Sequence, residues 1–130
     1  FVDFQVSYVS SPAIDLHYFM NSSASPEVLA NDRHVLIDEY YSTLCDMFCK
    51  LVHEELQPTR DTLNGELNKK KLFGVIAGLT LRSFALVDRN HVPDMDKLLK
   101  TDDSINLSKP YKEAIKQLLP LYEKWGWLNA

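Results

Sequence analysis

Residues 1–19 decide the fold expected of this chain, and they read FVDFQVSYVSSPAIDLHYF. Apolar and polar residues alternate over residues 1–6, which is typical of a short strand. Ser10-Ser11-Pro12 then predicts a turn, because proline suits the first position of a helix. Residues 13–20 are apolar on nearly every side, so we expect a short, buried helix there.

Two aspartates in this stretch are candidates for kinase chemistry. Asp3 follows an apolar strand residue and precedes Phe4, as does the carboxylate with which kinases hold Mg²⁺ against nucleotide phosphates. Alone, this pair is a weak signal, and a polar residue at a strand end explains it more simply. Asp15 lies twelve residues further on, inside the apolar helix. A buried carboxylate needs hydrogen bonds, so we expect Asp15 to accept them from a neighbouring loop; an exposed aspartate on a short helix is the alternative.

The two segments together resemble a known family. Residues 2–5 and 11–19 are similar to the signature of the ecdysteroid kinase-like family, also called CHK kinase-like. This family belongs to the choline-kinase and aminoglycoside-phosphotransferase branch of the protein-kinase-like folds. Shorter similarities follow in order along nearly the whole chain, at residues 25–28, 58–59, 72–78, 111–115, 118–121 and 126–128.

The resemblance implies a role for each aspartate. Asp3 would be the metal ligand that follows the catalytic loop, and Asp15 would be a buried support of that loop without a chemical role. Gln5 stands where choline kinases have Glu, and Gln is usual in the ecdysteroid kinase-like group. Ser10 and Arg82-Ser83 depart from the residues that relatives often carry, which leaves local backbone and substrate preference open.

The rest of the chain predicts helices. Ser25 is the expected N-cap of the longest one, which has Pro26 at its first position and one apolar stripe that ends near Leu56. Thr59 is the expected cap of the next helix, whose stripe begins at Leu63 and Leu67 and extends to Leu79. Within it, Gly74 and Gly78 are four residues apart, so another helix could approach closely.

The C-terminal third predicts two further helices and a tail. Residues 94–99 form a candidate short helix between loops, and Pro110 begins a helix that extends through Leu119. Pro120 restarts or kinks it, Gly126 ends it, and Trp125 and Trp127 follow in a docking tail. The expected class is therefore mainly α, the C-terminal lobe of a protein-kinase-like α+β fold, with one N-terminal strand and about five helices.

Residues 1–130 are expected to form one partial kinase-like lobe. The sequence has no Gly-rich loop, no nucleotide-binding Lys with a Glu partner, and no catalytic loop with an Asp base. A single strand also needs a partner for its backbone groups. We therefore expect the N-lobe and the catalytic loop to lie upstream of Phe1, and the 130 residues alone to be inactive.

The composition of the chain argues against several classes of binding partner. The chain has a net charge of −4, which argues against a nucleic-acid or anionic-membrane surface. Its apolar runs fall short of the roughly 20 residues that a membrane span needs. Cys45 and Cys49 lack further ligands at zinc spacing and are expected to be thiols in a reducing compartment, so we expect a cytoplasmic protein. His17 is expected to be a hydrogen-bonded core histidine, although a pocket role stays open.

The leading functional hypothesis is an ATP- and Mg²⁺-dependent kinase that phosphorylates a hydroxyl group on a small molecule. By resemblance, the acceptor is an ecdysteroid or another sterol or xenobiotic alcohol. A choline- or aminoglycoside-type kinase is the first alternative, and its cationic acceptor would need carboxylates or aromatic faces. A non-catalytic helical binding module is the second. The sequence leaves substrate-binding residues and oligomeric state open.

Overall fold

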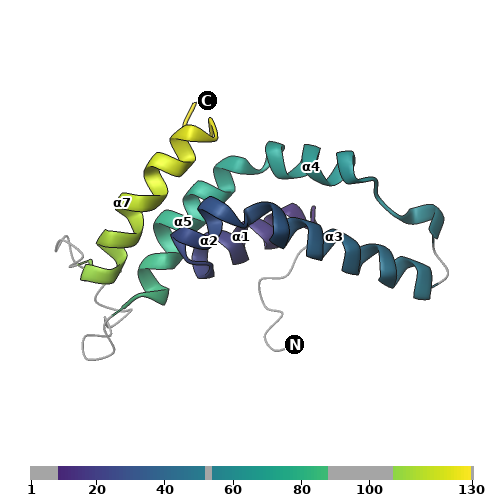
Figure 1. The fold of residues 1–130 in the computed structure, drawn as a ribbon, viewed down its shortest axis with the longest axis horizontal. Helices are drawn as coiled ribbons and strands as arrows, with labels where there is room; N and C mark the ends of the chain where they lie inside the picture. Colours follow the sequence, from purple (N-terminus) through teal and green to yellow (C-terminus); the bar gives the residue numbers. More distant parts are fainter. Residues whose placement is uncertain (1–8, 52–53, 88–106, 130) are drawn as a thin grey trace.

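The computed structural model describes residues 9–51, 54–87 and 107–129, and these form a layered set of helices (Figure 1). The mainly α class is confirmed. The expected strand at residues 1–6 and the expected helix at residues 94–99 lie outside the described residues. In chain order the helices are α1 (Ala13–Ser23), α2 (Pro26–Asn31), α3 (Arg33–Lys50), the 3-10 turn η1 (Glu54–Leu56), α4 (Arg60–Lys69), α5 (Lys71–Ala85) and α7 (Lys109–Lys124).

Three hydroxyl side chains define helix starts. The side chains of Ser25, Thr59 and Ser108 accept hydrogen bonds from backbone N–H groups three residues further on. Each bond satisfies a donor that the first helical turn leaves without an intrahelical partner. The expected caps at Ser25 and Thr59 are confirmed. The last helix begins at Lys109 rather than Pro110, because Ser108 provides its cap.

Two helices that were expected to be continuous are each broken once. Asp32, at φ −118° and ψ 10°, separates α2 from α3, and Lys70, at φ −99° and ψ 10°, separates α4 from α5. The first break lets Leu29 and Ile37 both enter the core, while Val35 stays 50% exposed and Leu51 60% exposed. The apolar stripe that was expected to end near Leu56 is therefore buried only in part, and α3 ends at Lys50.

The closest packing in the fold joins α1 to α5 through glycine. A Cβ atom on Gly74 would lie 2.6 Å from Nδ1 of His17, and one on Gly78 would collide with the hydroxyl group of Tyr122. The expected close approach at this glycine pair is thus confirmed, and the partners are α1 and α7. Leu72 and Ile76 lie within the stripe that was expected to extend from Leu63 to Leu79, but both are exposed. The buried residues of α5 are mostly small, namely Gly74, Val75, Ala77 and Gly78, and Arg82 is the large exception.

The C-terminal tail folds back onto this layer. α7 continues through Pro120 without a restart, and Gly126 at φ 69° ends the helix as expected. The backbone N–H of Trp127 donates to the carbonyl of Tyr122 (2.8 Å), and that of Gly126 donates to the carbonyl of Glu123 (2.9 Å). These two bonds are the Schellman arrangement, which needs a left-handed residue such as glycine. The turn stacks Trp127 on Tyr122 with ring centroids 5.5 Å apart, which confirms the docking tail.

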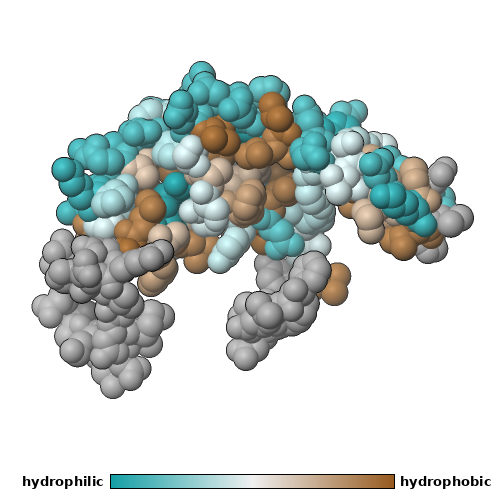
Figure 2. All heavy atoms as spheres, turned by 60° about the horizontal axis from the view of Figure 1, so that its bottom comes forward, coloured by the Kyte–Doolittle hydropathy of each residue, from teal (hydrophilic) through white to brown (hydrophobic). Residues whose placement is uncertain are grey.

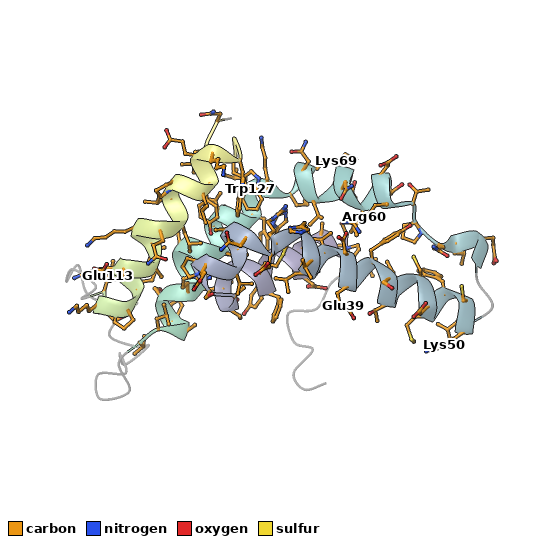
Figure 3. All side chains as sticks on the ribbon, in the orientation of Figure 1. Glu39, Lys50, Arg60, Lys69, Glu113 and Trp127 are labelled. Carbon is orange, nitrogen blue, oxygen red and sulfur yellow. The ribbon has the colours of Figure 1, made fainter. Side chains whose placement is uncertain are left out.

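The far half of α3 extends away from this core beside η1 and α4 (Figure 1). Tyr41 donates to the Pro58 carbonyl (3.2 Å), and Arg60 pairs with Asp38 between α3 and α4 (Figure 3). Figure 2 shows hydrophobic residues at the surface in the middle of the molecule and at the end where α3 approaches η1. The helices described are each too short or too polar to cross a bilayer.

Candidate functional site

α1 carries the second candidate aspartate, and the structure places it on the solvent side. Asp15, Tyr18 and Phe19 are exposed, whereas Leu16, His17 and Met20 on the other side are buried. Residues at i, i+3 and i+4 share one helix face, so these three form a single surface, the Asp15 face. The expectation that α1 is buried on nearly every side was therefore wrong for the described residues, in which Asp15 is exposed, as the alternative for this residue had it. Its support of a catalytic loop stays a prediction.

Asp3 lies outside the described residues, so its position and its metal role stay predictions. Within the part of the chain that the structure describes, no three His, Cys, Asp or Glu side chains come together as a metal site. Mg²⁺ in nucleotide enzymes is held by only one or two carboxylates together with substrate phosphates. The proposed magnesium role therefore depends on Asp3.

A network of buried polar side chains fixes the position of the Asp15 face. His17 is fully buried, and its Nε2 lies 2.8 Å from the backbone carbonyl oxygen of Leu67 in α4. Its Nδ1 has no hydrogen-bond partner, which fits a neutral ring that carries its proton on Nε2. Burial lowers the pKa of His17. The hydrogen bond to Leu67 raises this pKa, and the nearby charge of Arg33 lowers it further, so that the pKa is lowered overall. The expected core histidine is confirmed.

Asn21 links α1 to two other helices. Its Nδ2 donates to the His17 carbonyl (2.8 Å), and its Oδ1 accepts from the Tyr122 hydroxyl group of α7 (3.0 Å). Its backbone carbonyl accepts from Nε of Arg82 in α5 (2.9 Å). Burial raises the pKa of Tyr122 to about 12, so its hydroxyl group keeps the proton that it donates.

Arg82 caps the C-terminal end of α1. Besides the Asn21 bond, its Nη2 donates to the Ala24 carbonyl (2.6 Å), and the side chain is only 4% exposed. A cation is favoured at a helix C-terminus, where carbonyl groups lack intrahelical partners. The departure from the family pattern at this position thus has a structural use.

The residues missed in the sequence were the partners of α1. Asn21 is bonded to Arg82, which lies 61 positions away in the sequence, and to Tyr122, which lies 101 positions away. The spacing of Gly74 and Gly78 indicated that a helix packs there, but not which one. Two signals in the sequence could have indicated these partners: the polar Asn21 near the end of the apolar α1, and Arg82 within the apolar α5.

A comparison with known proteins finds a family model that matches the first part of the chain, residues 1–54. It indicates a kinase-like small-molecule phosphotransferase. The family whose model matches is the ecdysteroid kinase-like family, over residues 1–54, a segment that contains both Asp3 and Asp15 and all of α1 to α3. The resemblance found in the sequence is thereby confirmed over residues 1–54, and the shorter similarities after residue 54 stay predictions. No curated protein and no solved structure matches the chain.

Proposed function

We propose that the protein containing this chain transfers the γ-phosphoryl group of ATP, with Mg²⁺, to a hydroxyl group of an ecdysteroid or another sterol or xenobiotic alcohol. The observation that carries the proposal is the family match over residues 1–54, which includes both aspartates. The chain would form a C-terminal lobe, and the residues that bind ATP and orient the acceptor would come from elsewhere in the protein.

Asp3 and Asp15 would have different roles in the transfer reaction. Asp3 would hold Mg²⁺, which when bound offsets the negative charge of the phosphate oxygens. Asp15 would accept hydrogen bonds from the loop that carries the catalytic base. The structure supports this second role through position: the carboxylate is exposed on a helix whose opposite side is held by α4, α5 and α7. A rigid support with a free carboxylate is what such bracing requires.

Asp3→Asn in the complete gene product tests the metal role. We expect the transfer rate to fall by about a thousandfold or more, because an amide oxygen carries no charge to balance that of Mg²⁺. Asp46→Asn on the exposed side of α3 is the matched control and should retain full activity. Activity of Asp3→Asn within a few-fold of the unchanged protein would remove the metal role.

Asp15→Asn separates support from chemistry. We expect kcat to fall by about 10- to 100-fold while ATP affinity stays the same, because a misplaced loop weakens orientation rather than nucleotide binding. Isothermal titration with a non-hydrolysable ATP analogue measures the second quantity. Equal kcat in both proteins would show that Asp15 supports no catalytic loop.

A cationic acceptor is the second candidate, and the Asp15 face is the observation that favours it. A carboxylate beside the exposed rings of Tyr18 and Phe19 offers both an opposite charge and aromatic faces to a cation. Transfer assays with an ecdysteroid and with choline at equal concentration decide between the two. A higher kcat/KM for choline would replace the sterol acceptor, and transfer to neither would favour a non-catalytic binding module.

A further inference from the structure

A small pocket opens where the start of α3 faces α4 and the C-terminal tail. Its volume is about 230 Å³, roughly that of eight water molecules in the liquid. It is lined by Arg33, Ile37, Asn64, Leu67, Asn68 and Trp127. Figure 3 shows Trp127 where the end of α7 meets the junction of α4 and α5. The lining residues thus come from three separate parts of the chain.

Arg33 brings an uncompensated positive charge to this pocket. Its guanidinium carbon lies 5.4 Å from the ring centroid of Trp125 and 5.2 Å from that of Trp127. Its Nε is buried without a hydrogen-bond partner, and no carboxylate of the described residues pairs with it. Burial accordingly lowers the pKa of Arg33. Partly buried charges are usually paired, because desolvation otherwise costs free energy.

The rest of the pocket suits the oxyanion that Arg33 lacks. Asn64 and Asn68 are four residues apart on α4 and so share one helix face. Asn64 uses its Oδ1 to accept from Nε of Arg60 (3.4 Å), which leaves its amide N–H groups free to donate. Ile37, Leu67 and the Trp127 ring supply apolar surface. Polar donors on one part of the lining and apolar groups on another suit an amphipathic ligand.

The volume of the pocket favours a ligand smaller than a sterol. Sites for drug-sized ligands usually measure about 300–1,000 Å³, and this pocket measures about 230 Å³. It is therefore better matched to a small ligand than to the sterol acceptor of the proposed kinase.

We propose that this pocket binds a small organic anion, whose carboxylate or similar oxyanion head pairs with Arg33 and accepts from the Asn64 and Asn68 amides. The apolar part of the anion contacts Ile37, Leu67 and Trp127. Planar oxyanions match the fork of N–H donors on a guanidinium, which explains an arginine at this position better than a lysine. Benzoate is the probe, and benzyl alcohol is its neutral counterpart of similar shape.

Tryptophan fluorescence reports on this pocket directly. The chain has two tryptophans, and Arg33 lies over both. We expect benzoate to change the emission of the full 130-residue chain with a saturable curve and a Kd of about 1 mM or tighter. Saturation-transfer NMR on the benzoate protons gives the same Kd independently of the indoles. Benzyl alcohol should bind at least about tenfold more weakly, and equal binding of the two overturns the proposal.

Arg33→Met removes the charge and keeps an unbranched side chain over the indoles. We expect it to weaken benzoate binding by at least about tenfold in the NMR titration. The matched control is Lys116→Met, because Lys116 is exposed on α7, pairs with Glu113 and does not line the pocket, so the variant removes the same charge elsewhere. Benzoate affinity should change less than twofold in that variant. Unchanged affinity in Arg33→Met overturns the proposal.

A second pair of variants tests the same site without touching the tail. Asn68 is exposed, so Asn68→Asp leaves the core intact and places a negative charge at the pocket. We expect at least about tenfold weaker benzoate binding, since like charges repel in a partly desolvated site. Gln117→Glu on the exposed side of α7 adds the same charge elsewhere and should leave affinity unchanged. Equal weakening by both variants would reduce the effect to net charge and overturn the site.

Discussion

Gly74→Ala is the substitution that tests the packing of α1 on α5 most directly. An added Cβ would lie 2.6 Å from Nδ1 of His17, 3.0 Å from Nδ2 of Asn21 and 3.0 Å from the Trp127 ring. Each of these side chains is buried and held by a hydrogen bond or a ring contact. The methyl group therefore cannot be accommodated by a flexible side-chain end.

The magnitude is the difference between a gain and a larger loss. Alanine favours the helix over glycine by about 1 kcal/mol. Overpacking a dense core costs about 1–3 kcal/mol, and displacing His17 from the Leu67 carbonyl oxygen costs a further 1–3 kcal/mol, roughly, for an unsatisfied buried group. We expect Gly74→Ala to lower the free energy of unfolding by about 1–5 kcal/mol.

Urea unfolding followed by circular dichroism measures the change. Gly65→Ala on α4 is the matched control, because nothing lies within 4 Å of an added Cβ there. That control should raise stability by up to about 1 kcal/mol through helix propensity alone. Gly74→Ala at or above the stability of the unchanged protein, with Gly65→Ala behaving as expected, would refute the close approach of α1 and α5.

Three further predictions concern the buried polar network. Folding lowers the pKa of His17 from 6.5, so as the pH falls the unfolded chain takes up a proton at this residue before the folded chain does. The urea midpoint should therefore fall as the pH drops below about 6.5. His17→Asn should reduce this pH dependence of the urea midpoint. Arg82→Met should cost about 2–4 kcal/mol of unfolding free energy, since it leaves the Asn21 and Ala24 carbonyls without their donor; a loss below about 0.5 kcal/mol would contradict the cap. Tyr122→Phe should lower the free energy of unfolding by about 1 kcal/mol, because it removes the hydrogen bond to Asn21. Since the pKa of Tyr122 is raised from 10.0 to about 12 on folding, the protein should lose stability as the pH rises from 10 to about 12, and Tyr122→Phe should abolish the part of this loss that Tyr122 causes.

Local signals in the sequence predicted local structure well. Hydroxyl caps at Ser25 and Thr59, the helix stop at Gly126 and the close approach at Gly74 and Gly78 all follow from interactions within a few residues or from the size of a side chain. Such features depend little on the rest of the fold. They located the helix starts and the tail turn.

Features that depend on distant partners were predicted poorly. One apolar stripe runs along α3, yet Ile37 is the residue of that helix that is buried, because burial is decided by where other helices lie. Asp15 was expected to be buried because its neighbours in sequence are apolar, but Leu16 and Met20 lie on the other side of α1 from it. For the candidate site, the family and both aspartates could be predicted from the sequence, whereas the contacts of Arg82 and Arg33 are visible only in the structure.

The long-range hydrogen bonds of Asn21 have a consequence for the order in which the chain folds. Its partners stand 61 and 101 positions away, and His17 is joined to a carbonyl 50 positions away. Helical proteins with mostly local contacts assemble fastest, whereas long-range contacts delay assembly until the intervening loop has closed. During synthesis, the bond between Asn21 and Tyr122 can therefore form only after α7 has been made, so the polar network around α1 is completed late.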